Sequence, residues 1–320
     1  MNENSTASTL RRHEKYDHLI AAAKSLQPIA TAVAHPCDET SLRGAVEAGE
    51  AGLIKPILLG PKDKIAAVAK QYSLNLGNIE IVDVPHSQAA AEKAVELVRT
   101  GKADLLMKGS LHTDELLSEV MKRETGLRTG RRVSHVFVMD GPGHAQTLFI
   151  TDAAVNIAPD LISKRDIIQN AIDLYAGLGL GIPKVAILSA VETVTSTIPS
   201  TIEAAALCKM ADRGQITGGE LDGPLAFDTA ISPEAAHIKG IKSQVAGQAQ
   251  ILVVPDLEAG NMLAKNLTFL SHADAAGIVL GARVPIILTS RADHVRTRMA
   301  SCAVAALLRH CQMAKQPIRA

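Results

Sequence analysis

The sequence predicts an α/β protein in which a mostly parallel sheet is covered by helices on both faces. Short apolar segments of strand length alternate with amphipathic segments of helical length, which is the pattern of parallel strands joined by helices. Hydrophobic residues make up 47% of the chain and aromatic residues only 2%, so the core must be built from Ala, Val, Ile and Leu. At 320 residues the chain is long for a single core, so we expect two domains.

The first half contains four apolar segments of strand length, each next to an amphipathic segment of helical length. The expected strands are 29–34, 56–59, 79–82 and 104–107. The expected helices lie near 15–25, 39–50, 61–71 and 87–100. Two further strands, 133–139 and 146–150, flank the turn-forming sequence Asp140-Gly-Pro-Gly, so we expect an antiparallel hairpin there.

The second half shows the same alternation. Helices are expected at about 163–177, 199–213, 228–238 and 257–270. Strands are expected at 184–188, 251–254, 276–280 and 286–288, with a last helix from about 293 to 308. Because no stretch rich in Ser, Pro or Gly separates the two halves, the domains must share a compact interface, with its seam near the hairpin at 140–150.

The composition argues against nucleic-acid and membrane partners. The 33 basic and 33 acidic residues give a net charge of zero, and four Phe, three Tyr and no Trp give few surfaces for stacking bases. Widely spaced cysteines without a CxxC pair predict free thiols rather than a metal site (Cys37, Cys208, Cys302 and Cys311). No apolar signal region begins the chain and no apolar run is long enough to span a bilayer, so we expect a cytoplasmic protein.

The segment 284–293 has the features of an anion site. An apolar strand ends in Thr289-Ser290-Arg291, and Asp293 opens the last expected helix. Free backbone N–H groups, the positive end of a helix dipole and the Arg donors would converge there, and phosphate is the natural ligand. The alternative is that Ser290 or Asp293 only caps the helix and Arg291 is solvated.

Polar residues also follow other expected strands, where ligands bind in open α/β sheets. Lys108 could meet a phosphate as a point charge, while Gly109 would let backbone approach; a solvated lysine in a turn is the alternative. The other candidates are Ser110, Arg131, Arg132, Ser134, His135, Thr151, Asp152 and Asn156. Adjacent arginines on a strand point opposite ways, so at most one of the pair can face a given site. The glycine-rich stretches match neither a dinucleotide fingerprint nor a P-loop.

Six motifs, taken in their order along the chain, resemble those of the phosphate acetyltransferase/phosphate butyryltransferase family. The resemblance extends over about residues 15–310. The chain is also similar to the transferase part of fusions with an enoyl-CoA hydratase. The motifs are Lys108-Gly-Ser, Ser134-His, Thr151-Asp-Ala-Ala-Val-Asn-Ile-Ala-Pro-Asp, Gly223-Pro-Leu-Ala-Phe-Asp-Thr-Ala, Val254-Pro-Asp-Leu-Glu-Ala-Gly-Asn-Met and Leu288-Thr-Ser-Arg-Ala-Asp. The resemblance implies two α/β/α domains, as in isocitrate and isopropylmalate dehydrogenases, with the active site in the interdomain cleft. Residues 1–141 and 283–320 would form the first domain and 142–282 the second. Family members are usually homodimers.

The resemblance also implies a reaction, the reversible transfer of an acyl group between CoA and inorganic phosphate. It requires no metal and no permanently bound cofactor, since CoA is a substrate. Arg291 would bind the phosphate with Arg131 or Arg132 as a second clamp, and Ser290 would stabilise the oxyanion or orient the thiol. Lys108, Ser110 and Ser134 would line the phosphate subsite, and the second domain would contribute Thr151, Asp152 and Asn156.

The resemblance leaves the general base and the acyl chain open. Acetyl-specific relatives are expected to carry an aspartate about two helical turns after the Ser-Arg pair, where this chain has Thr297. Asp293 is therefore the first candidate base and His135 the second. The form Thr289-Ser-Arg-Ala-Asp favours butyryl, whereas the similarity to the fusion proteins favours acetyl, which we expect.

Two alternatives belong to other functional classes. A metal-assisted, NAD-dependent decarboxylase on the same fold would need clustered Asp or His ligands, and the strand ends present no evident cluster. A non-catalytic relative that binds CoA or acyl phosphate would account for the departure at Thr297. Measurable turnover would exclude it.

Overall fold

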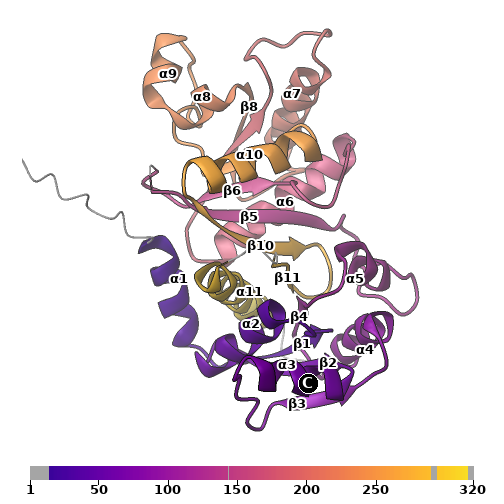
Figure 1. The fold of residues 1–320 in the computed structure, drawn as a ribbon. Coiled ribbons are helices and arrows are strands. Elements are labelled where there is room, and N and C mark those ends of the chain that lie inside the picture. Colours follow the sequence, from indigo (N-terminus) through magenta and orange to yellow (C-terminus); the bar gives the residue numbers. More distant parts are fainter. Residues whose placement is uncertain (1–13, 143, 290–293, 316–320) are drawn as a thin grey trace, which may run out of the picture.

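The computed structural model describes residues 14–142, 144–289 and 294–315 (Figure 1). The strands are β1 (Ile29–Ala34), β2 (Ile54–Gly60), β3 (Glu80–Asp83), β4 (Leu105–Lys108), β5 (Ser134–Asp140), β6 (Leu148–Thr151), β7 (Lys184–Leu188), β8 (Glu220–Leu225), β9 (Ile251–Val253), β10 (Asp274–Leu280) and β11 (Ile286–Ile287). The helices are α1 (Glu14–Lys24), α2 (Glu39–Glu50), α3 (Lys62–Gln71), α4 (Ser87–Arg99), α5 (Thr113–Val120), α6 (Leu161–Gly177), α7 (Pro199–Asp212), α8 (Phe227–Ile231), α9 (Pro233–Ile238), α10 (Leu257–Leu270) and α11 (Val295–Lys315).

The described strands form one continuous sheet with eleven members, in the order β3-β2-β1-β4-β11-β10-β5-β6-β9-β7-β8. Three antiparallel pairings, β11–β10, β10–β5 and β5–β6, lie together in the middle of the sheet. The other pairings are parallel. The expected α/β fold with a mostly parallel sheet is confirmed, and so is the hairpin of β5 and β6.

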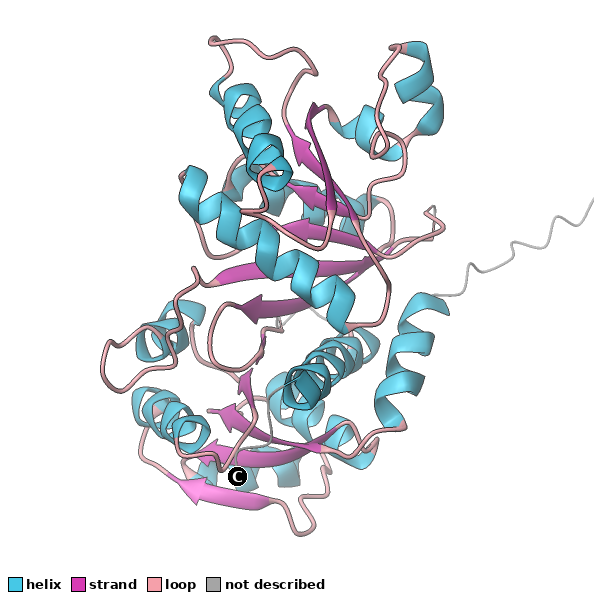
Figure 2. Ribbon diagram, turned by 180° about the vertical axis from the view of Figure 1, so that it is seen from behind, coloured by secondary structure: helices cyan, strands magenta, loops and turns pink. Residues whose placement is uncertain are grey.

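The two faces of the sheet are packed differently. One face carries a single core, to which α1, α2, α3, α6, α7 and α11 contribute. The other face carries two separate cores, one beneath α4 and α5 and one beneath α8, α9 and α10. Figures 1 and 2 show the same division, with α4 and α5 over one half of an elongated molecule and α10 over the other. The two cores meet at the central strands β10 and β5.

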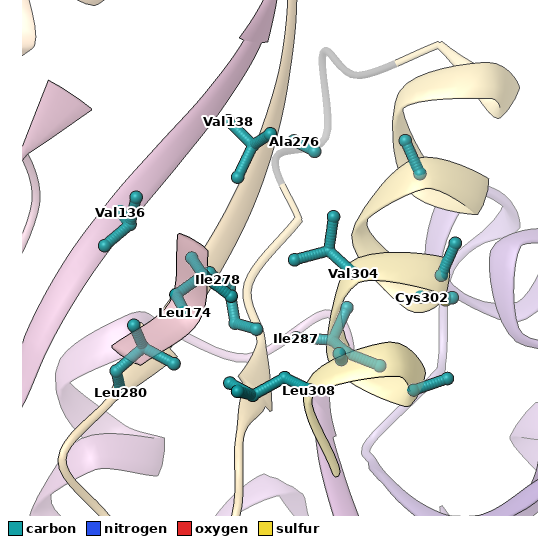
Figure 3. Close-up of a cluster of buried hydrophobic side chains, with 14 of the residues drawn as sticks. Val136, Val138, Leu174, Ala276, Ile278, Leu280, Ile287, Cys302, Val304 and Leu308 are labelled. Carbon is teal, nitrogen blue, oxygen red and sulfur yellow. The ribbon is translucent and has the colours of Figure 1, made fainter. Parts of the chain in front are cut away.

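Helix α11 packs against the antiparallel centre of the sheet from the single-core face. Its residues Val304 and Leu308 are buried and lie toward Ile287 of β11 and Ile278 of β10 (Figure 3). Leu174 of α6 belongs to the same core on this face. The last helix of the chain therefore seals the middle of the sheet, where its two halves join.

Two elements were not expected from the sequence, the strand β8 and the helix α5. Strand β8 contains Gly223 and Pro224, which weaken a strand signal because proline cannot donate to the ladder. The structure places β8 at the end of the sheet order, where only one neighbour is needed. Helix α5 is short, with eight residues, and follows the turn after β4.

The helix expected at 228–238 is instead two helices, α8 and α9. Pro233 begins α9 and lacks the N–H that would continue α8, while the Ser232 hydroxyl accepts a hydrogen bond from the Ala235 N–H at 3.2 Å and caps α9. Helix α11 runs to Lys315, beyond the expected end near 308.

The predicted domain boundaries fall next to the two central strands. The boundary at 141/142 follows β5 and the boundary at 282/283 follows β10, and these strands pair along their whole length. The division into two domains stays a prediction. Its boundary would lie where the core beneath α4 and α5 meets the core beneath α8, α9 and α10.

Candidate active site

Strands β4, β11 and β6 all end at one row of the sheet. The register aligns Met107, Ile287, Ile278, Val136 and Thr151 in that order. Strands β4, β11 and β5 run in the same direction, and β6 runs in the opposite direction. The chain therefore leaves the row on one side after β4 and β11 and on the opposite side after β6. The predicted site residues therefore form two groups on either side of the central strands, with β4 and β6 four strand spacings apart, about 19 Å.

The first group includes the turn after β4, which is held against the end of β1. The Ser110 hydroxyl donates to the His35 carbonyl oxygen at 2.8 Å and accepts from the Cys37 N–H at 3.2 Å. The Gly109 N–H donates to the Ala34 carbonyl oxygen at 2.9 Å. A Cβ atom on Gly109 would lie 2.3 Å from that oxygen. The backbone that approaches Gly109 is thus the end of β1, and only glycine fits there.

Lys108 ends β4 with its ammonium group folded over the same turn. Its Nζ donates to the carbonyl oxygens of Gly109 at 3.2 Å and Leu111 at 3.0 Å. These bonds hold a positive charge at the carboxyl end of β4, one residue beyond Met107 in the row. The Lys108 side chain is half-buried.

The chain after β11 crosses over the central strand β10. The Leu288 N–H donates to the Gly277 carbonyl oxygen at 3.2 Å, and the Leu288 oxygen lies 2.5 Å from the point that a Cβ on Gly277 would occupy. Thr289 follows and is buried. The candidate catalytic residues Ser290, Arg291 and Asp293 lie outside the described residues, which resume at His294.

The second group centres on Asp152, just after β6. Its carboxylate accepts hydrogen bonds from the N–H groups of Ala154 and Val155 at 3.0 Å and of Asn156 at 3.2 Å. The Asn156 side-chain amide also donates to Asp152 at 2.6 Å, and the Asn156 side-chain oxygen accepts from Arg132 Nε at 3.0 Å. A guanidinium, an amide and a carboxylate thus form one chain that fixes the loop after β6.

The segment that leads into β5 is tied to α6. Arg131 forms an ion pair with Asp173, and both side chains are exposed. The Asn170 side-chain amide donates to the Arg132 carbonyl oxygen and to the Ser134 hydroxyl, both at 2.9 Å. The two arginines precede β5 instead of lying on a strand, and they reach different partners, Asp173 and Asn156.

His135 lies on β5 where the two cores of the second face meet. It is buried against Phe137, and its Nε2 lies 3.0 Å from the point that a Cβ on Gly277 would occupy. The Thr151 hydroxyl donates to its carbonyl oxygen at 2.8 Å. Burial lowers the pKa of His135 to about 4, and the nearby charge of Asp152 offsets part of that effect. The imidazole is therefore neutral at pH 7.

The buried imidazole is expected to make the protein less stable in acid. An unfolded histidine binds its proton with a pKa of about 6.5, so between that pH and the folded-state pKa of about 4 the unfolded chain carries more protons. The free energy of unfolding should therefore fall by about 3 kcal/mol as the pH decreases from 6.5 to 4. Urea unfolding of His135→Gln across this range should lack that part of the decrease, whereas substitution of the exposed His237 by Gln should keep it. If the free energy of unfolding decreases equally with pH in both variants, His135 is not the group responsible.

A cavity of about 480 Å³ opens between α10 and the start of α11. Helix α10 contributes five of its lining residues and α11 contributes one, and the middle of β5 and the start of β10 also line it. Its lining residues are Phe137, Asn261, Ala264, Lys265, Thr268, Phe269, His272, Asp274, Ala275, His294 and Thr297. Helix α10 lies over one half of the sheet, and α11 packs against its centre (Figure 1).

The family profile described as phosphate acetyl/butaryl transferase matches residues 86–306, which span β4, the hairpin, α10 and most of α11. The chain belongs to this family. The phosphate acetyltransferase of Rhizobium meliloti is 75% identical over 293 residues, 92% of this chain and 93% of the relative. The phosphate butyryltransferase of Clostridium acetobutylicum is 43% identical over 295 residues, 92% of this chain and 98% of the relative.

A solved structure of this transferase family has the same fold. The branched-chain phosphotransacylase of Enterococcus faecalis V583 superposes with a TM-score of 0.75 at 31% identity, covering 88% of this chain and 99% of that chain. Two further properties concern the described residues alone. No helix among them is long and apolar enough to cross a membrane, and they contain no group of three or more His, Cys, Asp or Glu side chains that could hold a metal ion.

The cavity adds residues that were not predicted as part of a site in this transferase. Lys265, Phe269 and His272 come from the end of α10 and its following turn. One signal for them is visible in the sequence. Aromatic residues are scarce in this chain, with four Phe, three Tyr and no Trp, so each of them, including Phe269, is a candidate for a specific role. Thr297, which stands where an aspartate is expected in acetyl-specific relatives, also lines the cavity.

Proposed function

We propose that this chain is a phosphate acetyltransferase, which converts acetyl-CoA and phosphate reversibly into acetyl phosphate and CoA. The observation that carries the proposal is the 75% identity to a phosphate acetyltransferase over 92% of the chain. Identity to the phosphate butyryltransferase is lower, at 43%, so butyryl transfer is the second candidate.

The transfer needs an ionised CoA thiol and two stabilised anions. Only a few per cent of a thiol with a pKa of about 8.5 is ionised at pH 7, a handicap of roughly 2 kcal/mol. In the direction from acetyl phosphate, a base takes the thiol proton and the thiolate forms a C–S bond with the carbonyl carbon. The tetrahedral intermediate then collapses, the C–O bond to phosphate breaks, and phosphate leaves with the bonding electrons. Reversal gives the phosphorolysis of acetyl-CoA.

We assign the phosphate and the oxyanion to the group of residues after β4 and β11. Arg291 would bind the phosphate oxygens with charge-assisted hydrogen bonds of about 1.5–3 kcal/mol each, and Ser290 would donate to the oxyanion. The ammonium of Lys108, held at the end of β4, would supply a second cation, with Ser110 beside it. This geometry favours Lys108 over Arg131 and Arg132 as the second clamp.

The group after β6 is assigned a supporting role. Asp152 and Asn156 hold their loop together, and the Arg132 side chain is tied to that loop. Thr151 and Ser134 are buried with protein partners. These residues would shape the far side of the cleft rather than bind the transferred group.

Asp293 is the proposed base. His135, the other candidate, is neutral at pH 7 because burial lowers its pKa to about 4, so it offers no advantage over a carboxylate as a proton acceptor. Its Nε2 and the Leu288 carbonyl oxygen lie 3.0 Å and 2.5 Å from the point that a Cβ on Gly277 would occupy, so the ring is proposed to support the chain that leads to Ser290.

Direct transfer is favoured over a covalent acyl-cysteine. Burial raises the pKa of the Cys37 thiol to about 11 and of the Cys208 and Cys302 thiols to about 12. Such thiols stay protonated at pH 7 and are poor nucleophiles. Cys37 matters most here, because its N–H contacts Ser110 in the proposed phosphate subsite. CoA thus enters as a substrate in a ternary complex, and the active protein is proposed to be a homodimer without a bound cofactor.

The acyl preference is tested by phosphate-dependent release of CoA from acetyl-CoA, propionyl-CoA and butyryl-CoA. We expect turnover with all three and the highest kcat/KM with acetyl-CoA, with a loss of about 10- to 200-fold per added methylene, since one methylene contributes about 1–3 kcal/mol. Preference for butyryl-CoA would support the second candidate. Absence of turnover with every substrate would overturn the proposal and favour a non-catalytic relative that binds CoA or acyl phosphate.

A further inference from the structure

We propose that His35 exchanges a proton with the phosphate during the transfer, through the Nε2 atom of its imidazole ring. This inference rests on the proposed function, because it assigns one step of the same reaction to a further residue. His35 lies outside the six motifs that carry the family resemblance.

The reaction needs such a group on the phosphate side. When the C–O bond of acetyl phosphate breaks, the bonding electrons pass to a phosphate oxygen, which without a proton would leave as the trianion. The Nε2–H of an imidazolium gives this oxygen its proton, so the products are hydrogen phosphate and a neutral ring. The proton that the proposed base takes from the thiol returns to the ring through solvent. In phosphorolysis, neutral Nε2 accepts the proton of the attacking hydrogen phosphate.

The position of His35 is the first argument. Strands β1 and β4 are neighbours in the sheet, and their register pairs Ala34 with Lys108 (Figure 1). His35 is the next residue after β1, and its ring Nδ1 lies 3.2 Å from the Ser110 hydroxyl oxygen. The imidazole therefore stands at the turn after β4, next to the residues assigned to the phosphate.

The hydrogen bonds of Ser110 fix which ring nitrogen carries the proton. A hydroxyl has one hydrogen, and Ser110 donates it to the His35 carbonyl oxygen at 2.8 Å. In the contact with Ser110, Nδ1 must then be the donor, which leaves the lone pair of the neutral ring on Nε2. This atom forms no hydrogen bond with a described residue and is not among the buried atoms that lack a partner, so it is accessible from solvent. Nε2 is thus an accessible base beside the phosphate subsite.

The backbone of His35 is the second argument. Its φ of 54° lies in the left-handed region, which is costly for most residues that have a Cβ. In this conformation its carbonyl oxygen accepts hydrogen bonds from the N–H groups of Cys37 and Ser110, both at 2.9 Å. Glycine would give the same backbone bonds without strain, so these bonds alone do not explain a histidine here. Strained residues of this kind cluster at functional sites.

The charges around the ring suit both directions of the reaction. The groups that act on it come from several elements, namely Lys64 of α3, Glu115 of α5, Asp38 before α2 and His86 before α4. Burial, and after it the charge of Lys64, lower the pKa of His35, and Glu115 and Asp38 oppose this effect. The ring is therefore mostly neutral at pH 7, as a base must be. A bound phosphate dianion raises the pKa again and favours the imidazolium that acts as the acid.

His35→Asn is the first test. The Asn amide can donate to Ser110 in place of Nδ1 and tolerates the left-handed backbone, but it cannot take up a proton in place of Nε2. Its kcat should fall by about 100-fold or more in both directions, the usual contribution of general acid–base catalysis. If His35 only positions Ser110, this variant keeps its kcat.

His35→Gly allows the ring to be supplied from solution. The substitution leaves the left-handed backbone unstrained, and added imidazole should restore part of the rate. In phosphorolysis the restored rate should follow the concentration of neutral imidazole as the pH is varied, which a positioning role does not predict.

His86→Asn is the matched control. His86 is exposed, and its Nδ1 accepts the Ala89 N–H at 3.2 Å, a helix cap that Asn can also provide. This variant should keep the kcat of the unsubstituted protein, and imidazole should have no effect on it.

Two measurements separate this inference from the proposed function. If the unsubstituted protein turns over, a His35→Asn variant with undiminished kcat would overturn the inference and leave the acetyltransferase in place. If the unsubstituted protein shows no turnover, the acetyltransferase is rejected, and NMR titration of the His35 ring with and without inorganic phosphate still tests the contact. A pKa of His35 raised by phosphate would retain it as a phosphate ligand, and an unchanged pKa would overturn the contact as well.

Discussion

Replacing Arg291 by alanine is expected to lower kcat/KM for acetyl phosphate by about 100- to 1000-fold, the loss typical of removing one donor to a developing oxyanion. The guanidinium is proposed to bind phosphate oxygens in both directions of the reaction, so the reverse rate should fall by a similar factor. Steady-state kinetics in both directions measure the effect.

Arg291→Lys should recover only a small part of the lost rate, because an ammonium is a point charge that lacks the bidentate geometry of a guanidinium. Arg43→Ala is the matched control, since Arg43 forms an ion pair with Glu39 within α2. It should leave kcat/KM unchanged. Full activity in Arg291→Ala would remove this residue from the mechanism.

Gly109→Ala is expected to combine a loss of stability with a loss of activity. The added Cβ would lie 2.3 Å from the Ala34 carbonyl oxygen and 2.6 Å from the His35 carbonyl carbon, so the ends of β1 and β4 must separate. Overpacking of this kind lowers the free energy of unfolding by about 1–3 kcal/mol, and more where backbone must move. A displacement of Lys108 and Ser110 by about 1 Å would also lower kcat on the order of 100-fold.

Denaturant unfolding and steady-state kinetics of Gly109→Ala test the two parts separately. Gly141→Ala is the control, because a Cβ there would meet its nearest neighbour, the Ala273 Cβ, at 3.7 Å, an ordinary contact. A Gly109→Ala protein that is as stable and active as the Gly141→Ala protein would show that the turn after β4 tolerates displacement.

The fold was largely predictable because most elements carry a local signal. Strands β1 and β7 and helices α2 and α10 begin and end where the hydrophobic pattern places them. Strand β8 was missed because its place at the sheet edge tolerates Gly223 and Pro224, residues that argue against a strand in sequence. The break between α8 and α9 could have been predicted, since Pro233 and its capping Ser232 are visible in the sequence.

The candidate site was predictable only in part, because contacts between distant segments leave no local signal. Lys108 and Ser110 were found from their place at a strand end, and the structure adds the partner that fixes them, the end of β1. No local signal predicts that α10 lies near the start of α11, so Lys265 and Phe269 are not among the predicted site residues. Sequence reasoning likewise could not tell that Asp152 is occupied by the N–H groups of its own loop.

The most direct test of the proposed reaction is the stoichiometry of acetyl-CoA phosphorolysis. The purified protein is mixed with acetyl-CoA and phosphate, and free thiol and acetyl phosphate are measured in the same sample. The account predicts that both products appear in equal amounts and only when phosphate is present. Release of CoA without phosphate, or without acetyl phosphate, would contradict direct transfer between CoA and phosphate.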